Sequence, residues 1–321
     1  MSRPVATLSF DLDDLWTYRR THGDPDWESA PSYLPVLVPR LLEALAARSL
    51  RVTVFVVGRD AERTEHRDLL RSIATAGHEI GNHSHHHQQW LHLYSEEDLD
   101  QELEQAETAI EQATGQAPRG FRGPGYSLSR TTLEVLDRRG YRYDASTLPT
   151  FLGPLARAYY FRRARLADDA RRRRAQLFGT WADALRPIRP YRWRLESGSL
   201  LEIPVTTMPG LRLPFHLSYP LWLGTFSPLL ARLYFELALR LCRLAGVAPS
   251  LLLHPLDFLA ADDAPGLGFF PAMGLSLDRK LALTHRLLDR YHHHFEPLPL
   301  GDFADRLDGV ALRERDPDLP K

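Results

Sequence analysis

The sequence predicts an α/β protein in which strands and helices alternate around a mainly parallel sheet. Over the first 145 residues, short apolar or β-branched runs alternate with amphipathic segments of helical period. The 321 residues, of which 44% are hydrophobic, suffice for one large domain, or for one domain with insertions. Chemistry in such proteins collects at the carboxyl ends of the strands, so the residues that follow each strand are the first candidates for a functional site.

Periodicity and terminating residues define the elements of the first 145 residues. Strands are expected at residues 5–10, 51–57, 78–81, 120–122 and 141–144. Helices are expected at residues 33–48, 68–76, 95–114 and 129–139. The last three helices are each followed by a glycine, and the longest begins with acidic residues, which the helix macrodipole favours at that end. This order of elements is typical of repeated βα units.

A basic segment interrupts the alternation over residues 150–198. It contains about a dozen arginines, including a run at 171–174, together with several aromatic residues. We interpret it as a helical, arginine-rich insertion into the domain. Beyond it, the sequence predicts a strand at 200–204, an apolar segment at 213–248 with a helix from Pro228, a last buried strand at 250–254, a helix at 276–291 and a polar tail at 313–321.

Charge and cysteine content exclude several classes of protein. Forty Lys and Arg residues against 41 Asp and Glu residues leave a formal net charge of −1, so no nucleic-acid partner is expected. The single cysteine, Cys242, excludes an internal disulfide and a cysteine-based zinc site. The apolar run at 5–10 is too short for a secretory signal, and no stretch approaches the roughly 20 apolar residues of a membrane span. We therefore expect a cytoplasmic protein.

Two histidines four residues apart follow the strand at 78–81. His83 and His87 would project onto one face of a helical turn, where their imidazoles can bind one divalent metal. A solvated polar loop is the alternative interpretation of this histidine-rich run. The later histidines at 292–294 are expected at an exposed helix end.

Carboxylates that follow the first strand supply a third ligand. Asp11 and Asp13 are separated by one residue, so both can face the mouth of the strand. A metal would offset the repulsion between the two charges. This arrangement predicts Asp13 as a ligand and Asp11 as a nearby base, and the alternative is a capping or turn cluster.

Two further strand ends carry residues suited to catalysis. Arg122 can orient a carboxylate with its planar guanidinium, and the Gly-Pro-Gly turn at 123–125 can expose an N–H toward a reacting oxygen. His254 ends the apolar strand at 250–254 and would be the general acid of a metal-hydrolase pocket. An ordinary turn and a satisfied core or rim histidine are the corresponding alternatives.

These motifs, taken in order, resemble those of the NodB-type polysaccharide deacetylases, carbohydrate esterase family 4. The matching segments are residues 9–13, 77–87, 121–126, 143–146 and 253–255. The Asp-x-Asp form of the first motif is more similar to the deformylases of lipid-linked aminoarabinose and to the cyclic-amide hydrolases of the superfamily. Adjacent Asp residues are commoner in the chitin and peptidoglycan deacetylases. Gly125 stands where many members have Tyr, and the basic segment has no counterpart in the family's minimal pattern.

The resemblance implies a distorted (β/α) barrel that forms one catalytic domain over residues 1–321, and a metal-dependent hydrolysis of an amide. Asp13, His83 and His87 would hold a divalent metal, usually zinc. The remaining implied roles are a base, Asp11, held in place by Arg122; an acid, His254, oriented by Asp144; and substrate contacts from Gly125, whose N–H would stabilise the oxyanion, and from Tyr126. Asp14 and Asp257 are left without a role.

The expected activity is that of a deacylase that removes an acetyl or formyl group from an amino sugar. A lipid-linked or nucleotide-linked glycan is the expected substrate. The arginines and aromatic residues of 159–194 and the apolar residues of 213–244 favour peripheral contact with an anionic membrane, on its inner face, or with phosphate groups. A solvated helical arm is the alternative for the basic segment.

Three other functions are considered beside the amino-sugar deacylase. A cyclic-amide hydrolase of the same superfamily and an inactive metal-binding or glycan-binding module are the alternatives. A phosphatase of the HAD type is disfavoured, because Asp14 and Leu15 stand where that motif has Gly-Thr and because the histidine pair would have no role.

Overall fold

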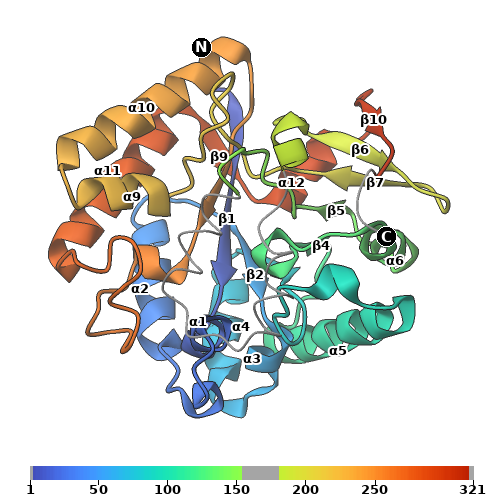
Figure 1. The fold of residues 1–321 in the computed structure, drawn as a ribbon, viewed down its shortest axis with the longest axis horizontal. Coiled ribbons are helices and arrows are strands. Elements are labelled where there is room, and N and C mark those ends of the chain that lie inside the picture. Colours follow the sequence, from blue (N-terminus) through green and yellow to red (C-terminus); the bar gives the residue numbers. More distant parts are fainter. Residues whose placement is uncertain (1–2, 154–180, 318–321) are drawn as a thin grey trace.

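A ten-stranded sheet forms the centre of the computed structural model, which describes residues 3–153 and 181–317 (Figure 1). The strands are β1 Val5–Leu12, β2 Thr53–Val56, β3 Glu79–Asn82, β4 Gly120–Phe121, β5 Tyr143–Asp144, β6 Tyr191–Arg194, β7 Ser199–Glu202, β8 Ser250–Leu253, β9 Glu296–Leu298 and β10 Glu314–Arg315. Neighbouring strands follow the order β10-β6-β7-β5-β4-β3-β2-β1-β8, and β9 pairs with β1. Every one of these pairs is parallel except β6–β7, as the βα alternation predicts.

Helices cover the sheet between successive strands. The α-helices are α1 Leu15–His22, α2 Leu34–Ala46, α3 Gly58–Glu62, α4 Arg67–Thr75, α5 Glu96–Thr114, α6 Arg130–Arg138, α9 Ser218–Gly224, α10 Pro228–Ala245, α11 Leu277–His294 and α12 Leu300–Arg306. Short 3-10 turns are η1 Trp27–Ser29, η2 Thr64–His66, η3 Leu91–Leu93, η4 Pro124–Tyr126, η5 Trp181–Leu185 and η6 Pro255–Asp257. In Figure 1, α9, α10 and α11 lie together on one side of the molecule, and α5 and α6 lie on the opposite side.

The long helices α5 and α10 begin and end as their sequences predict. The hydroxyl of Ser95 accepts a hydrogen bond from the third residue of α5, and Gly115 ends that helix in the left-handed conformation. Ser227 caps α10 in the same way, Pro228 occupies its first position, and Gly246 ends it. The predicted starts of both helices are confirmed.

The central strands are buried on both of their faces. Leu8 and Phe10 of β1, Val54 of β2 and Leu253 of β8 are inaccessible to solvent. Runs of this kind are typical of parallel strands that helices cover on both sides. Within this apolar layer, Asp11 lies at the carboxyl end of β1, where the sheet meets the site described below.

Several short elements were not predicted from the sequence. β9 has only three residues and contains Pro297, which lacks an amide donor and so weakens the strand pattern. The helix α12 follows it directly, and α1 begins immediately after Asp14. Glu314 and Arg315, in the predicted polar tail, form β10 and pair with β6.

Most of the predicted insertion, including the arginine run at 171–174, lies outside the described residues. Its described part, 181–198, holds η5 and β6, and β6 pairs antiparallel with β7. Tyr191 and Trp193 are buried and alternate with the more accessible Arg192 and Arg194, which is the period of a strand. This end of the segment therefore belongs to the sheet and is not a helical arm.

The two strands at the edges of the sheet, β10 and β8, do not pair with each other in the described part of the chain. The order runs from β10 to β8, so closure into a barrel stays a prediction. An irregular segment spans the gap, since the amide of Val205 donates to the carbonyl of Thr147 and that of Thr206 donates to Ser250 on the β8 side. No helix within 3–153 or 181–317 combines the length and apolar character required to cross a membrane.

Candidate metal and catalytic site

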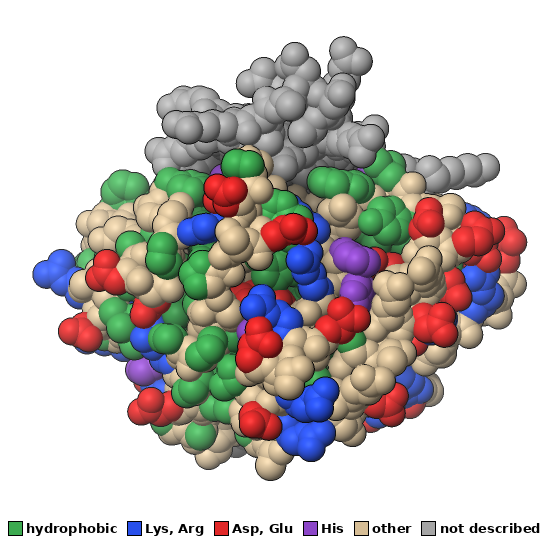
Figure 2. Space-filling model, turned by 90° about the horizontal axis from the view of Figure 1, so that it is seen from below, with side chains coloured by type: hydrophobic (Ala, Val, Ile, Leu, Met, Phe, Trp, Pro, Cys, Tyr) green, Lys and Arg blue, Asp and Glu red, His purple; other side chains and the backbone are tan. Residues whose placement is uncertain are grey.

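Parallel register brings the predicted site residues to one edge of the sheet. The strands β1 and β8 are in register up to the positions just before Asp11 and His254. The strands β3 and β4 are in register at the positions just before His83 and Arg122. Each functional side chain therefore leaves its strand beside that of a neighbour. Figure 2 views the molecule from the end toward which β1 points, where histidine side chains reach the surface among acidic and basic ones.

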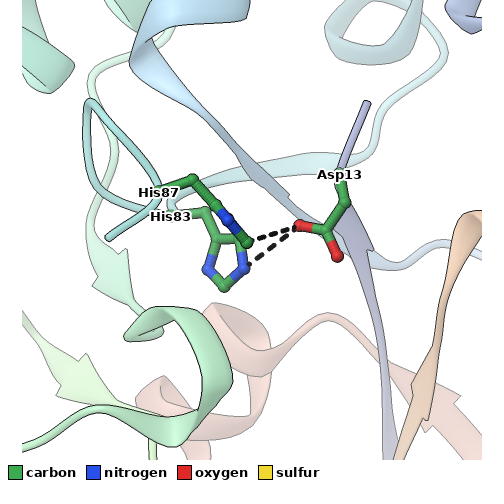
Figure 3. A group of neighbouring side chains, drawn as sticks. All are labelled: Asp13, His83 and His87. Carbon is green, nitrogen blue, oxygen red and sulfur yellow. Dashed lines mark ion pairs between the residues drawn. The ribbon is translucent and has the colours of Figure 1, made fainter. Parts of the chain in front are cut away.

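Asp13, His83 and His87 form a buried group at this edge (Figure 3). Oδ1 of Asp13 lies 3.0 Å from Nε2 of His87 and 3.4 Å from Nε2 of His83. The two imidazole rings lie 5.0 Å apart between their centroids. One carboxylate oxygen thus faces two imidazole nitrogens, as the sequence predicts for these three residues.

The donor set fits a divalent transition metal. Two imidazoles and one carboxylate are ligands that zinc and similar ions accept. Ligand atoms about 2.0–2.2 Å from a tetrahedral metal lie about 3.3–3.6 Å apart, close to the separations found in this group. Nδ1 of His83 lies 2.6 Å from the carbonyl oxygen of Arg122, so this nitrogen carries the proton and Nε2 keeps its lone pair for a metal.

The histidines converge through a bent loop and not through the helical turn that the sequence suggests. Ser84 and His87 have positive φ angles of 62° and 50°, and residues 83–87 form no helix. Oδ1 of Asn82 accepts a hydrogen bond from the amide of Ser84, and the Ser84 hydroxyl accepts one from the amide of His87. These short-range hydrogen bonds stabilise the left-handed positions and direct both rings toward Asp13.

Glu102 of α5 also stabilises the histidine loop through hydrogen bonds, and this residue was not predicted from the sequence. Its Oε1 accepts hydrogen bonds from the amides of His85 and His86, at 2.9 and 2.7 Å, and its Oε2 lies 2.6 Å from Nδ1 of His86. Leu99 and Leu103 share its buried helix face. A carboxylate among apolar neighbours on one helix face is the signal that could have identified Glu102.

Arg122 and Asp11 form a fully buried ion pair. One guanidinium nitrogen of Arg122 lies 2.7 Å from Oδ1 of Asp11 and 2.9 Å from the hydroxyl of Ser9. Nε donates to the carbonyl of Ala145, and the guanidinium stacks over Phe55 at 4.3 Å from the ring centroid. These contacts fix Arg122, so the structure brings Asp11 and Arg122 together as predicted.

The ring of His254 lies between Asp11, which faces its Nε2, and Ser218, which contacts its Nδ1. Its Nε2 is 4.0 Å from Oδ2 of Asp11, and its Nδ1 is 3.4 Å from the hydroxyl of Ser218. That hydroxyl donates to Oδ1 of Asp257 at 2.8 Å, and Oδ2 of Asp257 accepts from the amide of His254 at 2.8 Å. Asp257, which had no predicted role, and Ser218, which was not predicted, are therefore the groups that bind His254.

Asp144 lies within a different network. Its oxygens accept from the amide and hydroxyl of Ser146, and it contacts the carboxyl group of Glu202. Between described residues, no hydrogen bond or ion pair joins Asp144 to His254. The carboxyl groups of Asp144 and Glu202 lie on β5 and β7, at paired positions of the sheet. The contact through which Asp144 was expected to orient His254 is thus not present.

Gly125 and Tyr126 lie in a tight turn beside this site. Both have positive φ angles, 58° and 62°, and Gly125 is exposed. A Cβ at Gly125 would lie 3.5 Å from the side chain of Gln89, so the position has room but an unfavourable backbone for a larger residue. Burial, together with the charge of Asp11, raises the pKa of the Tyr126 hydroxyl, which keeps it protonated as a hydrogen-bond donor.

The charges of the metal-ligand group oppose the effect of burial. Burial favours neutral Asp13, but His87 and His83 lower the pKa of its carboxyl well below the usual value. Burial would lower the pKa of His83, yet the carboxylates of Asp11 and Asp13 raise it. For His87, burial outweighs Asp13, and its pKa is lowered. Two buried carboxylates therefore create a negative potential that suits a bound cation.

A second buried group, Asp14, Asp60 and His66, adjoins the first. One ligand atom from each lies within 4.8 Å of the others. Asp14 caps α1 and also accepts from the amide of Tyr33 at 3.1 Å, while Asp60 accepts from the indole N–H of Trp16 at 2.7 Å. We interpret the group as the polar support of the turn between β1 and α1, which is the capping alternative considered for this acidic run.

Two other histidine positions differ from expectation. His294 is buried, and its Nε2 lies 3.1 Å from Oε1 of Glu236, so only part of the 292–294 run is exposed. His216 was not predicted as a site residue, yet its buried ring lies 5.5 Å from that of His254. Burial lowers the pKa of His216 well below the usual value, so this ring is neutral at pH 7.

A sequence profile of the polysaccharide deacetylase family matches residues 4–143. A peptidoglycan deacetylase of Helicobacter pylori is 31% identical over 125 residues, which are 39% of this chain and 40% of that protein. A peptidoglycan deacetylase-like protein of Gibberella zeae, FGM2, is 32% identical over 147 residues, 44% of this chain and 43% of that protein. The chain thus spans less than half the length of these curated relatives.

The fold is also that of a solved relative. A Mycobacterium smegmatis structure described as a polysaccharide deacetylase superposes with a TM-score of 0.66 at 20% identity, covering 100% of this chain and 95% of that one. The matched profile ends at β5, and within it lie the strand-end aspartates, the histidine loop and Arg122. Residues 4–143 of the chain are therefore similar to the polysaccharide deacetylase family.

Proposed function

We propose that the protein is a metal-dependent deacylase that hydrolyses the amide of an N-acylated amino sugar. The observation that carries this proposal is the convergence of Asp13, His83 and His87 beside a buried Asp11–Arg122 pair, with His254 opposite. In this proposal, the same edge of the sheet would supply a metal-ligand group, a carboxylate base and an imidazole acid. Metal-dependent amide hydrolysis uses all three, because a metal and a base activate the water and an acid protonates the amine that leaves.

The metal we propose is zinc, held by Asp13, His83 and His87. When bound, it would polarise the amide carbonyl and lower the pKa of a water molecule. Two imidazoles and one carboxylate leave coordination positions open, as in catalytic rather than structural zinc sites. Zinc and the cytoplasmic location expected from the sequence both stay predictions.

Asp11 is the proposed base. It would accept a proton from the attacking water, while Arg122 keeps its carboxylate oriented through the 2.7 Å contact. The backbone N–H of Gly125 is the proposed donor to the developing oxyanion, since the positive φ of this residue allows the chain to approach the substrate closely. Tyr126 would bind the substrate beside it.

His254 is the proposed acid that protonates the leaving amine. Its Nδ1 lies 3.4 Å from the hydroxyl of Ser218, which donates in turn to the carboxylate of Asp257. These contacts fix the orientation of the ring, with Nε2 facing the site, where its proton would be donated to the amine. We assign Ser218 and Asp257 as positioning residues for His254, in place of Asp144.

Release of acetate or formate tests the proposed function. Zinc-loaded protein would be incubated with free, nucleotide-linked and lipid-linked N-acetyl and N-formyl amino sugars, and with small cyclic amides. We expect release from at least one amino sugar and none after chelation. Ring opening of a cyclic amide without release from any amino sugar would identify the protein as a cyclic-amide hydrolase instead.

A further inference from the structure

The helix α10 exposes a row of apolar side chains to solvent. We define its apolar face as Phe226, Leu229, Leu230, Leu233, Leu237 and Leu244. Leu233 is 58% exposed and Leu244 85% exposed. Spacings of three, four and seven residues place the leucines along one side of the helix, where the exposed Arg240 lies between Leu237 and Leu244, and Phe226 precedes the first turn. Trp222 of the neighbouring helix α9, 42% exposed, adds an aromatic group near its start.

This apolar face is not the face through which α10 packs on the protein. The buried residues of the helix are Ala231, Phe235, Ala238, Leu239 and Cys242, and these contact the core. A surface helix normally carries polar residues opposite its buried stripe, so α10 is apolar on two sides. An exposed apolar row of this kind marks an interaction surface.

The charges beside the apolar face are basic. Arg232 and Arg243 are exposed on its flank. The acidic group there, Glu236, is already engaged, with Arg240 at 2.8 Å, Arg290 at 2.7 Å and His294 at 3.1 Å. Apolar side chains bordered by arginines fit an anionic lipid surface. A symmetric contact between two copies would instead place like charges together.

The apolar face is connected to the catalytic edge through α9. This helix packs against α10 and against η6, the turn that follows His254. Its first residue, Ser218, contacts Nδ1 of His254, and its Trp222 is exposed beside the apolar face. One short helix therefore joins the surface to the group that would protonate the leaving amine.

We propose that the apolar face of α10, with Trp222, docks on an anionic membrane surface. Docking would place the His254 side of the site near lipid headgroups. This inference rests on the proposed function. Docking at the membrane favours a lipid-linked amino sugar over a nucleotide-linked one as the substrate. The leucines enter the headgroup region and the flanking arginines contact anionic lipid.

Vesicle flotation with the full chain tests this surface. The probes are vesicles of phosphatidylcholine alone and of phosphatidylcholine with phosphatidylglycerol. We expect the wild-type protein to bind the anionic vesicles at least tenfold more strongly. The variant Leu233→Glu/Leu237→Glu should lose that binding by more than tenfold, and Arg232→Gln/Arg243→Gln should lose mainly the preference for anionic lipid. The matched control is Leu93→Glu/Val310→Glu, whose parent side chains are 48% and 47% exposed elsewhere, and it should bind as the wild type does.

Three results would overturn the proposal. One is equal flotation of the wild type and the Leu233→Glu/Leu237→Glu variant. Another is a wild-type dimer that this variant dissociates, measured by light scattering. The third is a loss of several degrees in the melting temperature of the variant, since that would show the face is covered by the chain itself.

Failure of the proposed function would look different. The Leu233→Glu/Leu237→Glu variant should hydrolyse a free amino-sugar amide at the wild-type rate, because the substitutions lie outside the site. Vesicle binding by the wild type without hydrolysis of any amide would contradict the deacylase function. It would still support the membrane-docking role of the apolar face.

Discussion

Asp11 and Asp13 are separated by one residue, yet the structure gives them different partners. Asp11 contacts the guanidinium of Arg122, whereas Asp13 faces the imidazoles of His83 and His87. The planar guanidinium of an arginine suits a carboxylate that must be held in one orientation. Neutral imidazoles suit a carboxylate that shares a metal with them. The roles that we propose, base for Asp11 and metal ligand for Asp13, follow from these neighbours.

Asp11→Asn tests the proposed base. The amide keeps the size of the side chain but cannot accept a proton, so we expect kcat to fall about 10²- to 10⁴-fold. Metal content, measured by elemental analysis, should stay at the wild-type level, because Asp13 is unchanged. Full activity in this variant would remove Asp11 from the mechanism.

Asp257→Asn tests the positioning of His254. With the hydrogen-bonded chain through Ser218 weakened, we expect kcat for an amide to fall about tenfold or more with little change in KM. An activated aryl acetate, whose leaving group needs no proton, should be hydrolysed nearly as fast as by the wild type. A purely structural role would reduce both reactions equally, and Asp144→Asn is the matched control for a carboxyl that does not contact His254.

At the scale of elements, the site depends on strands that end in register. The strand ends at Asp11, His83, Arg122 and His254 could be predicted, since each follows an apolar run with a clear end. The conformation of the histidine loop could not, because it depends on the distant Glu102 and on left-handed residues that are stabilised by local polar side chains. Apolar periodicity carries no information on such polar contacts.

The same limit applies to the contacts of His254. Ser218 lies 36 residues before His254 and belongs to no motif, so only the fold places the two together. Asp144 follows a strand and has the chemistry of an orienting group, but β7 brings Glu202 to it instead. The order of β5, β6 and β7 in the sheet was not predicted from the sequence. Because this order places Glu202 beside Asp144, that contact was not predicted either.

The pairing of β5 with β7 predicts a dependence of stability on pH. Burial, with the nearby charge of Asp144, raises the pKa of Glu202 well above the usual value, so the folded protein keeps a proton that the unfolded chain releases. Stability should therefore fall as pH rises from about 4.5 toward the folded pKa, by about 1.4 kcal/mol per pH unit for one proton.

Urea unfolding of the wild type and of Glu202→Gln between pH 5 and pH 8 measures this effect. The variant should show a smaller fall with pH, because its amide does not titrate. It should also lose about 1 kcal/mol overall, since Glu202 binds Trp193 and Thr147. Parallel pH profiles for the two proteins would show that Glu202 is ionised when folded.

At the scale of the whole molecule, the described core supports one cooperative unit. One sheet contains all the described strands, and β1 lies next to β2, β8 and β9, which come from distant parts of the chain. The parallel fold class was predictable because buried strands and amphipathic helices alternate visibly. The position of β9 and β10 was not, since strands of three and two residues leave almost no pattern.

Thermal unfolding should accordingly show a single transition with coincident fluorescence and circular dichroism curves. Zinc at about 100 times its Kd should stabilise the folded state by about 2.7 kcal/mol and raise Tm by several degrees. Two separated transitions, of which zinc shifts only one, would contradict the single catalytic domain expected over residues 1–321.

The most direct test of the account is the metal content and deacylase activity of one purified sample, compared between the wild type and His83→Gln. We predict about one divalent metal ion per wild-type chain, with release of acetate or formate lost on chelation and restored by zinc. His83→Gln should keep its circular dichroism spectrum but lose both metal and turnover. Undiminished turnover by the metal-free wild type, or full metal binding and turnover by His83→Gln, would contradict the account.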